Sequence, residues 1–186
     1  MAHSQSSSRR NEDVIVRKYD ITSRSYDELY LLEQYEKYQY IFIEKKLEPG
    51  NIVLDIGCGT ALLYKYLVEK ELDVFRRYIC LEPSMGMLYY ARKKTMNDQR
   101  VLLINGYAEN IPMVDCSVDT IFLFSVWDNI IDKLLAVSEI KRVLKPGGYV
   151  ILSVLGKVKS LDPKNFFGEG LDFLGCRRDC FFVYVK

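Results

Sequence analysis

Two short segments of the chain combine residue types that can bind the ribose of an adenosine. An apolar, strand-like run over residues 52–56 leads into Gly57 and Gly59, and a second apolar run over residues 78–81 ends at Glu82. Glycines let a ligand approach the backbone closely, and a carboxylate at the end of a neighbouring strand can accept hydrogen bonds from both ribose hydroxyls. The pattern predicts an adenosine site at the carboxyl ends of parallel strands.

The spacing of the glycines indicates which kind of adenosine cofactor fits. A dinucleotide fingerprint has a third glycine three residues after the second, so that amides at a helix N-terminus can hold a pyrophosphate. Leu62 stands at that position here, and Ala61 precedes it. A cofactor without a phosphate fits this turn better, and an NAD-linked oxidoreductase is the weaker alternative.

Four segments carry a family resemblance. With Asp55 two residues before the first glycine, residues 52–60 resemble motif I of the class I S-adenosylmethionine (SAM) dependent methyltransferases. Residues 105–112, 117–122 and 139–149 resemble further motifs of that family, in the same order. The resemblance implies methyl transfer from SAM. It also implies a Rossmann-like α/β fold, with a mostly parallel seven-stranded sheet, helices on both faces and an antiparallel C-terminal hairpin strand.

The resemblance implies which residues hold the cofactor. SAM would lie over the turn at residues 57–59, with Glu82 on the ribose diol and Ser125 near the methionine end. Asp55 would fix the turn and approach the ammonium group of SAM. The expected cofactor-binding residues are Tyr26, Asp55, Gly57, Cys58, Gly59, Glu82, Pro83, Tyr107, Ala108, Glu109 and Ser125.

Adenine recognition is the point at which the chain departs from the family pattern. Many relatives carry an aspartate where this chain has Tyr107. Adenine is therefore expected to meet backbone amides near Ala108, the Glu109 carboxylate or the ring of Tyr107. The residue types leave these three alternatives open.

The methyl acceptor would meet residues that follow the fourth strand and tyrosines of an N-terminal cover. The expected candidates are Tyr19, Trp127 and Asp128, with Tyr26 closing over the methionine end of SAM. Each has a structural alternative. Trp127 suits a packing role equally well, Asp128 can N-cap a helix that begins near residue 130, and tyrosines at helical spacing often form the rim of a core.

Several chemistries are disfavoured. The single histidine, His3, lies in the polar N-terminal tail, so no triad, Cys-His dyad or metal site is expected from the rest of the chain. Residues 124–127 read Phe-Ser-Val-Trp in place of the Asn/Asp-Pro-Pro-Tyr motif, which argues against methylation of adenine N6 or a glutamine amide. The acceptor class stays open between RNA, protein and small molecules. A SAM-binding regulatory or supporting subunit without transfer activity is the alternative function.

Length and pattern predict the organisation of the chain. Its 186 residues, 49% of them apolar, suffice for one domain. Ser25 and Glu28 form a capping-box pattern for a helix that should reach about residue 46. The expected parts are a disordered tail over residues 1–13, a helical cover over 14–49, a SAM-binding core over 50–155 and closing strands over 156–186. Within the core, strands are expected at about 52–56, 77–81, 101–104, 118–124 and 149–155, and helices at about 60–70, 84–94 and 130–144.

The net charge and the cysteine content of the chain limit its expected cellular location and its expected partners. The formal net charge is +1, which gives no general attraction to a phosphate backbone, so net charge does not support a nucleic-acid acceptor. No apolar run approaches the ~18 residues of a membrane span. The five cysteines, at positions 58, 80, 116, 176 and 180, match neither a disulfide framework nor a zinc pattern. Free thiols in a reducing cytoplasm are therefore expected.

The third predicted strand, residues 101–104, is a candidate interaction site. The resemblance places it at the edge of the sheet, and it carries no lysine or proline of the kind that protects an exposed edge. Cover by the chain's own loops, or side chains that simply face the flanking helices, is the simpler expectation. The alternative is a protein activator that adds a strand there, as in certain methyltransferases of this fold that depend on a small zinc-binding activator.

Overall fold

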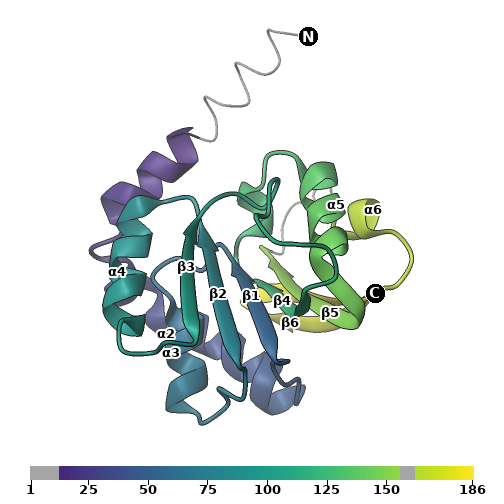
Figure 1. Cartoon of the computed structure of the whole chain (residues 1–186), viewed down its shortest axis with the longest axis horizontal. Coiled ribbons are helices and arrows are strands. Elements are labelled where there is room, and N and C mark those ends of the chain that lie inside the picture. The colour runs from purple at the N-terminus through teal and green to yellow at the C-terminus, as the bar shows by residue number, and fades with distance from the viewer. Residues whose placement is uncertain (1–12, 156–161) are drawn as a thin grey trace, which may run out of the picture.

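The computed structural model describes residues 13–155 and 162–186, which form a seven-stranded sheet flanked by helices (Figure 1). The strands lie in the order β3-β2-β1-β4-β5-β7-β6. The pairs from β3 to β5 are parallel, whereas β7 is antiparallel to β5 and β6. The predicted fold class is therefore confirmed. The strands are β1 (Ile52–Ile56), β2 (Arg77–Glu82), β3 (Val101–Asn105), β4 (Val118–Leu123), β5 (Leu144–Val154), β6 (Leu171–Arg177) and β7 (Asp179–Val185).

Helices cover both faces of the sheet. Side chains of α2, α3 and α4 form one apolar core with the sheet, and those of α5 and α6 form a second core on the opposite face. An N-terminal helix over residues 13–22 precedes α2 and lies beside α4 (Figure 1). Among the described helices, none is long and apolar enough to cross a membrane. The remaining helices are α2 (Tyr26–Gln39), α3 (Leu62–Glu69), α4 (Met85–Thr95), α5 (Lys133–Val143) and α6 (Lys164–Phe167).

The predicted N-terminal segments need three corrections. Residues 1–12 of the predicted tail lie outside the described residues, but Asp13 is helical. Ser25 precedes α2 without accepting a capping hydrogen bond, so the predicted capping box is wrong. The helix predicted to reach residue 46 ends at Gln39 and continues as a π-helical turn, Tyr40–Glu44. The hydroxyl of Tyr40 in that turn donates to the backbone of Leu174 in β6, 2.8 Å away.

The helix predicted over residues 130–144 starts later than expected. Trp127–Asn129 form a short 3-10 turn, and Asp132 accepts a hydrogen bond from the amide of Leu135, which makes it the N-cap of α5. The alternative reading of Asp128 as the N-cap is therefore wrong. The carboxylate of Asp128 instead accepts from the amide of Leu155, at 3.1 Å, and ties the 3-10 turn to the end of β5.

The crossover between β3 and β4 contains no helix in its described residues, 106–117. Arg142 of α5 holds this loop in place by donating to the carbonyl oxygens of Ile111 and Met113, at 2.9 and 2.7 Å. Because a loop replaces a helix, the adjacent face of the sheet keeps a hollow of about 440 Å³ beside β3. The hollow is lined by Ile52, Arg77, Ile79, Gln99, Arg100, Val101, Leu102, Met113 and Ser117.

The C-terminal hairpin corrects the expectation of five free thiols. Cys176 of β6 and Cys180 of β7 face each other in the antiparallel register and form a disulfide. Cys58, Cys80 and Cys116 are free. The pairing follows from the hairpin register, because a tight turn brings residues four apart in sequence directly opposite one another.

Candidate functional site

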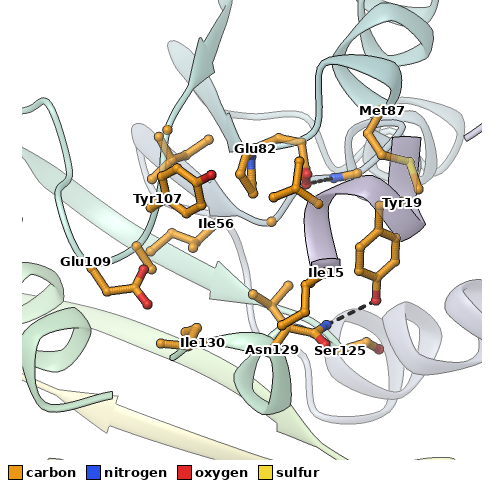
Figure 2. A pocket seen from close by; sticks show the side chains of 18 of the residues that line it. Ile15, Tyr19, Ile56, Glu82, Met87, Tyr107, Glu109, Ser125, Asn129 and Ile130 are labelled. Atoms are coloured by element: carbon orange, nitrogen blue, oxygen red, sulfur yellow. Dashed lines mark hydrogen bonds between the residues drawn. The ribbon is translucent and has the colours of Figure 1, made fainter. Parts of the chain in front are cut away.

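A pocket opens at the carboxyl ends of β1, β2 and β4, where the strand order reverses (Figure 2). Open α/β sheets bind their ligands at this position, because neighbouring crossovers leave the sheet on opposite faces there. The lining comes from the N-terminal helix, the starts of α2 and α4, the ends of β1 and β2, the turns after β1 to β4, and the 3-10 turn with the two residues after it. It consists of Ile15, Val16, Tyr19, Tyr26, Ile56, Gly57, Gly59, Leu81, Glu82, Pro83, Met87, Gly106, Tyr107, Ala108, Glu109, Phe124, Ser125, Val126, Asn129, Ile130 and Ile131.

The turn after β1 requires its two glycines for different reasons. Gly57 has φ +67°, and a Cβ atom there would lie 2.3 Å from a methyl carbon of Val126. Gly59 has φ +55° with open space around its Cβ position. The turn thus presents bare backbone to the pocket. Cys58, between them, is buried and lies outside the pocket lining.

Glu82 fixes this turn to the end of β2. Its carboxylate accepts hydrogen bonds from the amides of Gly59, at 3.0 Å, and Ser84, at 2.9 Å. Burial raises the pKa of Glu82 to about 7, although the two amide bonds partly oppose that rise. Each oxygen keeps a second lone pair, so the carboxylate can accept further hydrogen bonds from a ligand at the pocket wall.

Asp55 was predicted to approach the ammonium group of SAM, but it does not line the pocket. It is buried and accepts a hydrogen bond of 2.7 Å from the Tyr78 hydroxyl. Burial raises the pKa of Asp55 to about 7, and the nearby Glu82 carboxylate contributes to the rise. Asp55 is therefore placed to support the turn from behind.

These two carboxyls give the ligand-free protein a defined pH dependence. Both have folded pKa values near 7, above their ordinary values of 3.8 and 4.5. The unfolded chain therefore releases their protons at lower pH than the folded chain does. We expect the free energy of unfolding to fall as pH rises from about 4 to about 7. Urea titrations at about pH 5 and about pH 7.5 measure this slope. It should flatten in Asp55→Asn combined with Glu82→Gln, and a slope of opposite sign would contradict the prediction.

The predicted adenine side of the pocket is formed by residues 106–109. Tyr107 is partly exposed at the mouth, and Ala108 is buried. Glu109 accepts hydrogen bonds from the amides of Ile131 and Asp132, at 3.1 and 3.3 Å, so it also joins the loop to the start of α5. The structure thus brings Tyr107, Ala108 and Glu109 to one side of the cavity.

The N-terminal helix closes the opposite side. Ile15, Val16 and Tyr19 face the pocket at helical spacing, and the Tyr19 hydroxyl accepts from the Asn129 side chain at 3.1 Å (Figure 2). Asp20 holds the helix in place, because one carboxylate oxygen accepts from the Ser84 hydroxyl at 2.6 Å and from the Gly86 amide at 2.9 Å.

A second carboxylate anchors the start of α2. Asp27 pairs with Lys94 of α4 at 2.6 Å and accepts from the Thr60 hydroxyl, directly beside the glycine turn. Tyr26, its neighbour, lines the pocket, and burial raises the pKa of its hydroxyl. The N-terminal cover is thus fixed to both the glycine turn and α4.

Ser125 lines the pocket and is held there by hydrogen bonds of its side chain. It has φ +59°, and its hydroxyl accepts from Lys37 at 2.8 Å and lies 3.0 Å from Asp179, to which it donates. Asp179 also accepts from Ser153 at 2.7 Å and pairs with Lys37 at 3.2 Å. Gln34 completes this network with a 3.4 Å bond to Ser125.

We call Gln34, Lys37, Ser125, Ser153 and Asp179 the buried polar network. All but Ser125 are buried. Sequence analysis does not name Gln34, Lys37 or Asp179. For Gln34 and Lys37 the available signal is helical spacing, because they share one helix face with the buried Tyr38 and with Ile41 of the following π-helical turn. Asp179, at the start of β7, has no such signal.

Trp127 and Asp128 lie outside the pocket lining. The Trp127 ring is fully buried and packs between Phe166 and Phe167, with ring centroids 5.5 and 5.9 Å away. This placement favours the packing role over the predicted contact with an acceptor. Asn129, the next residue, reaches the cavity instead.

The pocket suits an adenosine without a pyrophosphate. Leu62, at the position of the third fingerprint glycine, is buried against the core, and Ala61 caps α3 in a left-handed conformation. No described lining residue is a lysine, an arginine or a histidine, so a pyrophosphate would find no cationic side chain. The bare turn and the Glu82 carboxylate fit a ribose, and SAM carries one without phosphate.

A mostly parallel open sheet with a pocket at its switch point defines a Rossmann-like α/β protein. Comparison with known proteins makes the class specific. The chain belongs to the methyltransferase domain family, whose model matches residues 54–152. The predicted class I SAM-dependent methyltransferase family is thereby confirmed.

Curated relatives include two demethylmenaquinone methyltransferases. That of Staphylococcus haemolyticus (strain JCSC1435) is 29% identical over 133 residues, covering 69% of this chain and 55% of the relative. That of Staphylococcus aureus (strain JH9) is 28% identical over 145 residues, covering 76% and 60%. The chain thus spans a little over half the length of these relatives.

Solved structures share the fold. A chain from the complex between the Haloferax volcanii Trm112 methyltransferase activator and a methyltransferase superposes with a TM-score of 0.75 at 18% identity, covering 90% of this chain and 96% of that one. A SAM-dependent methyltransferase from Aquifex aeolicus gives a TM-score of 0.68 at 22% identity, with 92% and 96% covered.

Proposed function

We propose that the chain binds SAM in this pocket and transfers its methyl group to an acceptor. The observation that carries the proposal is the Glu82 carboxylate, which the amides of Gly59 and Ser84 hold at the pocket wall. The chain that carries this site belongs to the methyltransferase domain family. When bound, SAM supplies a methyl group already activated by a sulfonium, and S-adenosylhomocysteine remains after transfer.

The chain's own residues have binding and positioning roles in this proposal. Glu82 accepts from the ribose diol, and the turn at Gly57 and Gly59 leaves room for the sugar. Pro83, Tyr107, Ala108 and Glu109 surround adenine. Ser125 and Tyr26 bound the methionine end, Cys58 is the buried middle residue of the turn, and Asp55 supports the turn from behind. Tyr19 faces the acceptor. Closure by the N-terminal helix excludes water and aligns the reactants, an effect worth up to about 7–11 kcal/mol.

Two measurements test the proposal. Titration calorimetry should show binding of SAM and S-adenosylhomocysteine but not of NAD, and absence of SAM binding at millimolar concentration would refute it. Transfer of a radiolabelled methyl group into fractionated cell extract then separates an enzyme from the alternative, a SAM-binding regulatory or supporting subunit. We keep a cytoplasmic location as a prediction, which cell fractionation checks.

Glu82→Ala should weaken SAM binding by about 1.5–3 kcal/mol, or roughly 10-fold to 150-fold, because it removes a charge-assisted acceptor for two hydroxyls. Calorimetry with SAM measures the loss. The SAM affinity of Glu82→Gln should lie between those of the unaltered protein and Glu82→Ala, because the amide keeps one acceptor oxygen. Glu169→Ala, at an exposed position, is the matched control. A Glu82→Ala protein that melts normally and binds SAM with unchanged affinity would show that the ribose assignment is wrong.

We further propose that a protein activator adds a strand to β3. Three observations support this. β3 is at the edge of the sheet, its Leu102 is 53% exposed, and the hollow beside it is lined by apolar side chains and flanked by Arg77 and Arg100. The Haloferax volcanii chain of similar fold was solved with an activator. Light scattering and hydrogen exchange over residues 101–104 test the idea. An active monomer whose β3 amides exchange slowly without any partner would remove its basis.

A further inference from the structure

The acceptor side of the pocket is almost entirely apolar. Beyond the residues assigned to SAM, its wall includes Ile15, Val16 and Tyr19 of the N-terminal helix, with Asn129 beside Ile15 and Tyr19, and Ile130 next to it in the chain (Figure 2). As noted above, the described lining contains no cationic side chain. The described wall therefore offers an anionic acceptor no side-chain counter-ion to replace its lost hydration, and the positive charge at the site would belong to SAM itself. The electrostatics of this wall disfavour phosphate or carboxylate acceptors.

The carboxylates of the pocket do not favour a cationic acceptor either. Glu82 binds two backbone amides, and Glu109 binds two more. Figure 2 shows Glu109 near Tyr107 and across the pocket from Tyr19. Glu82 is close enough to Tyr19 to contribute to the rise in the pKa of its hydroxyl, but the Glu82 carboxylate already accepts two amides and is assigned to the ribose diol. A cation at the wall of Ile15 and Tyr19 would therefore meet no carboxylate that is free of other partners.

One directional polar group remains on the acceptor side. The Tyr19 hydroxyl accepts from the Asn129 side chain, which orients it, and no described group accepts its own proton. Burial raises the pKa of Tyr19, so the hydroxyl stays protonated at neutral pH. Tyr19 can thus donate one hydrogen bond into the cavity.

The cover restricts the size of the acceptor. Asp20 fixes the N-terminal helix to Ser84 and Gly86, and Asp27 fixes the start of α2 to Thr60 and Lys94. With these contacts in place, the pocket wall is continuous from the glycine turn to α4. These contacts favour a small acceptor over a segment of a folded RNA or protein, which needs more room on this side of the pocket.

We infer that the pocket takes a small, uncharged, largely apolar acceptor whose hydroxyl or carbonyl oxygen receives the hydrogen bond of Tyr19. The inference rests on the proposed SAM-dependent transfer and names the substrate class of that same site. The described lining carries it through three features: an apolar wall, the absence of a cationic side chain and a single oriented donor.

The test compares three probes that share one ring system. The protein is first saturated with S-adenosylhomocysteine, which calorimetry detects separately. It is then titrated at neutral pH with 1-naphthol, 1-naphthoate and 1-naphthylmethylamine, which are neutral, anionic and cationic respectively. We expect 1-naphthol to bind at least about tenfold more tightly than either charged probe. Tyr19→Phe should weaken 1-naphthol by roughly threefold to tenfold, the value of one hydrogen bond, and leave S-adenosylhomocysteine affinity unchanged.

A charge introduced at the wall provides a gain-of-function test. Ile15→Arg should lower the preference for 1-naphthol over 1-naphthoate by at least about tenfold, because the anion gains a counter-ion. Ile21→Arg makes the same change on the exposed side of the same helix and should leave the preference unaltered. If Ile15→Arg does not fold, Val16→Arg replaces it, since Val16 lines the same wall.

Each outcome decides the inference. Preferential binding of 1-naphthol that responds to Ile15→Arg and Tyr19→Phe supports it. Tighter binding of either charged probe would overturn it, as would no binding of any probe by a protein that binds S-adenosylhomocysteine. Labelling of only RNA or protein in the extract assay would also overturn it while leaving the proposed function intact. Failure to bind S-adenosylhomocysteine at all would refute the proposed function instead, and this inference with it.

Discussion

A chain carrying Gly57→Val is expected to lose SAM binding and to unfold more readily than the unaltered protein. At φ +67° a β-branched residue is strained, and its Cβ would lie 2.3 Å from a methyl carbon of Val126. Relief of that overlap must displace the turn or Val126, both of which line the pocket. We expect a destabilisation of about 2–4 kcal/mol and at least a roughly hundredfold loss of SAM affinity. Urea titration and calorimetry measure the two effects.

Gly147→Val is the control for Gly57→Val, because it introduces the same backbone strain at a glycine that does not line the pocket. Gly147 has φ +76° with open space around its Cβ position, and it lies in β5 outside the pocket lining. The variant should therefore cost about 1–2 kcal/mol of stability and leave SAM affinity unchanged. If both variants bind SAM equally well, the turn at Gly57 does not form the cofactor site.

The second large effect is expected from Lys37→Met, through the buried polar network. The lysine pairs with Asp179 at 3.2 Å and donates to Ser125 at 2.8 Å. Its removal leaves the Asp179 carboxylate buried and without its cation, which costs about 3–5 kcal/mol in measured cases. Oδ1 of Asp179 already lacks a partner among the described residues, so the remaining bonds cannot compensate. Thermal or urea unfolding measures the loss.

Two further variants identify the cause of that loss. Asp179→Asn added to Lys37→Met removes the unpaired charge and keeps an acceptor for the serine hydroxyls, so it should restore at least about half of the stability. Lys65→Met breaks an exposed pair with Glu69, of 3.6 Å, and should cost less than about 0.5 kcal/mol. Equal costs for Lys37→Met and Lys65→Met would show that the buried pair contributes no more than a surface one.

The sequence predicted those parts of the site that depend on one strand and the turn after it. Glu82 is the last residue of β2, and Gly57, Gly59 and Ser125 come just after β1 and β4. Their positions in the pocket are determined once these strands are aligned in parallel. The fold class was predictable for the same reason, because alternating strands and helices admit few arrangements.

The remaining features depend on contacts between distant segments. Lys37 lies on α2 and Asp179 at the start of β7, so their pairing requires the complete sheet order. The burial of Trp127 depends on Phe166 and Phe167, which arrive from beyond β5. The disulfide between Cys176 and Cys180 depends on the register of the hairpin. No local periodicity carries this information.

The position of β7 has a consequence for synthesis of the chain. β7 follows β5 and β6 in sequence but lies between them in the sheet, so β5 keeps an unpaired edge on the ribosome until β7 has been translated. Asp179 arrives with that strand and supplies the counter-ion that Lys37 needs beneath Ser125. The part of the pocket at Ser125 is therefore expected to assemble late. A nascent chain paused before β7 would expose an unpaired strand edge of β5 and would leave Lys37 without Asp179.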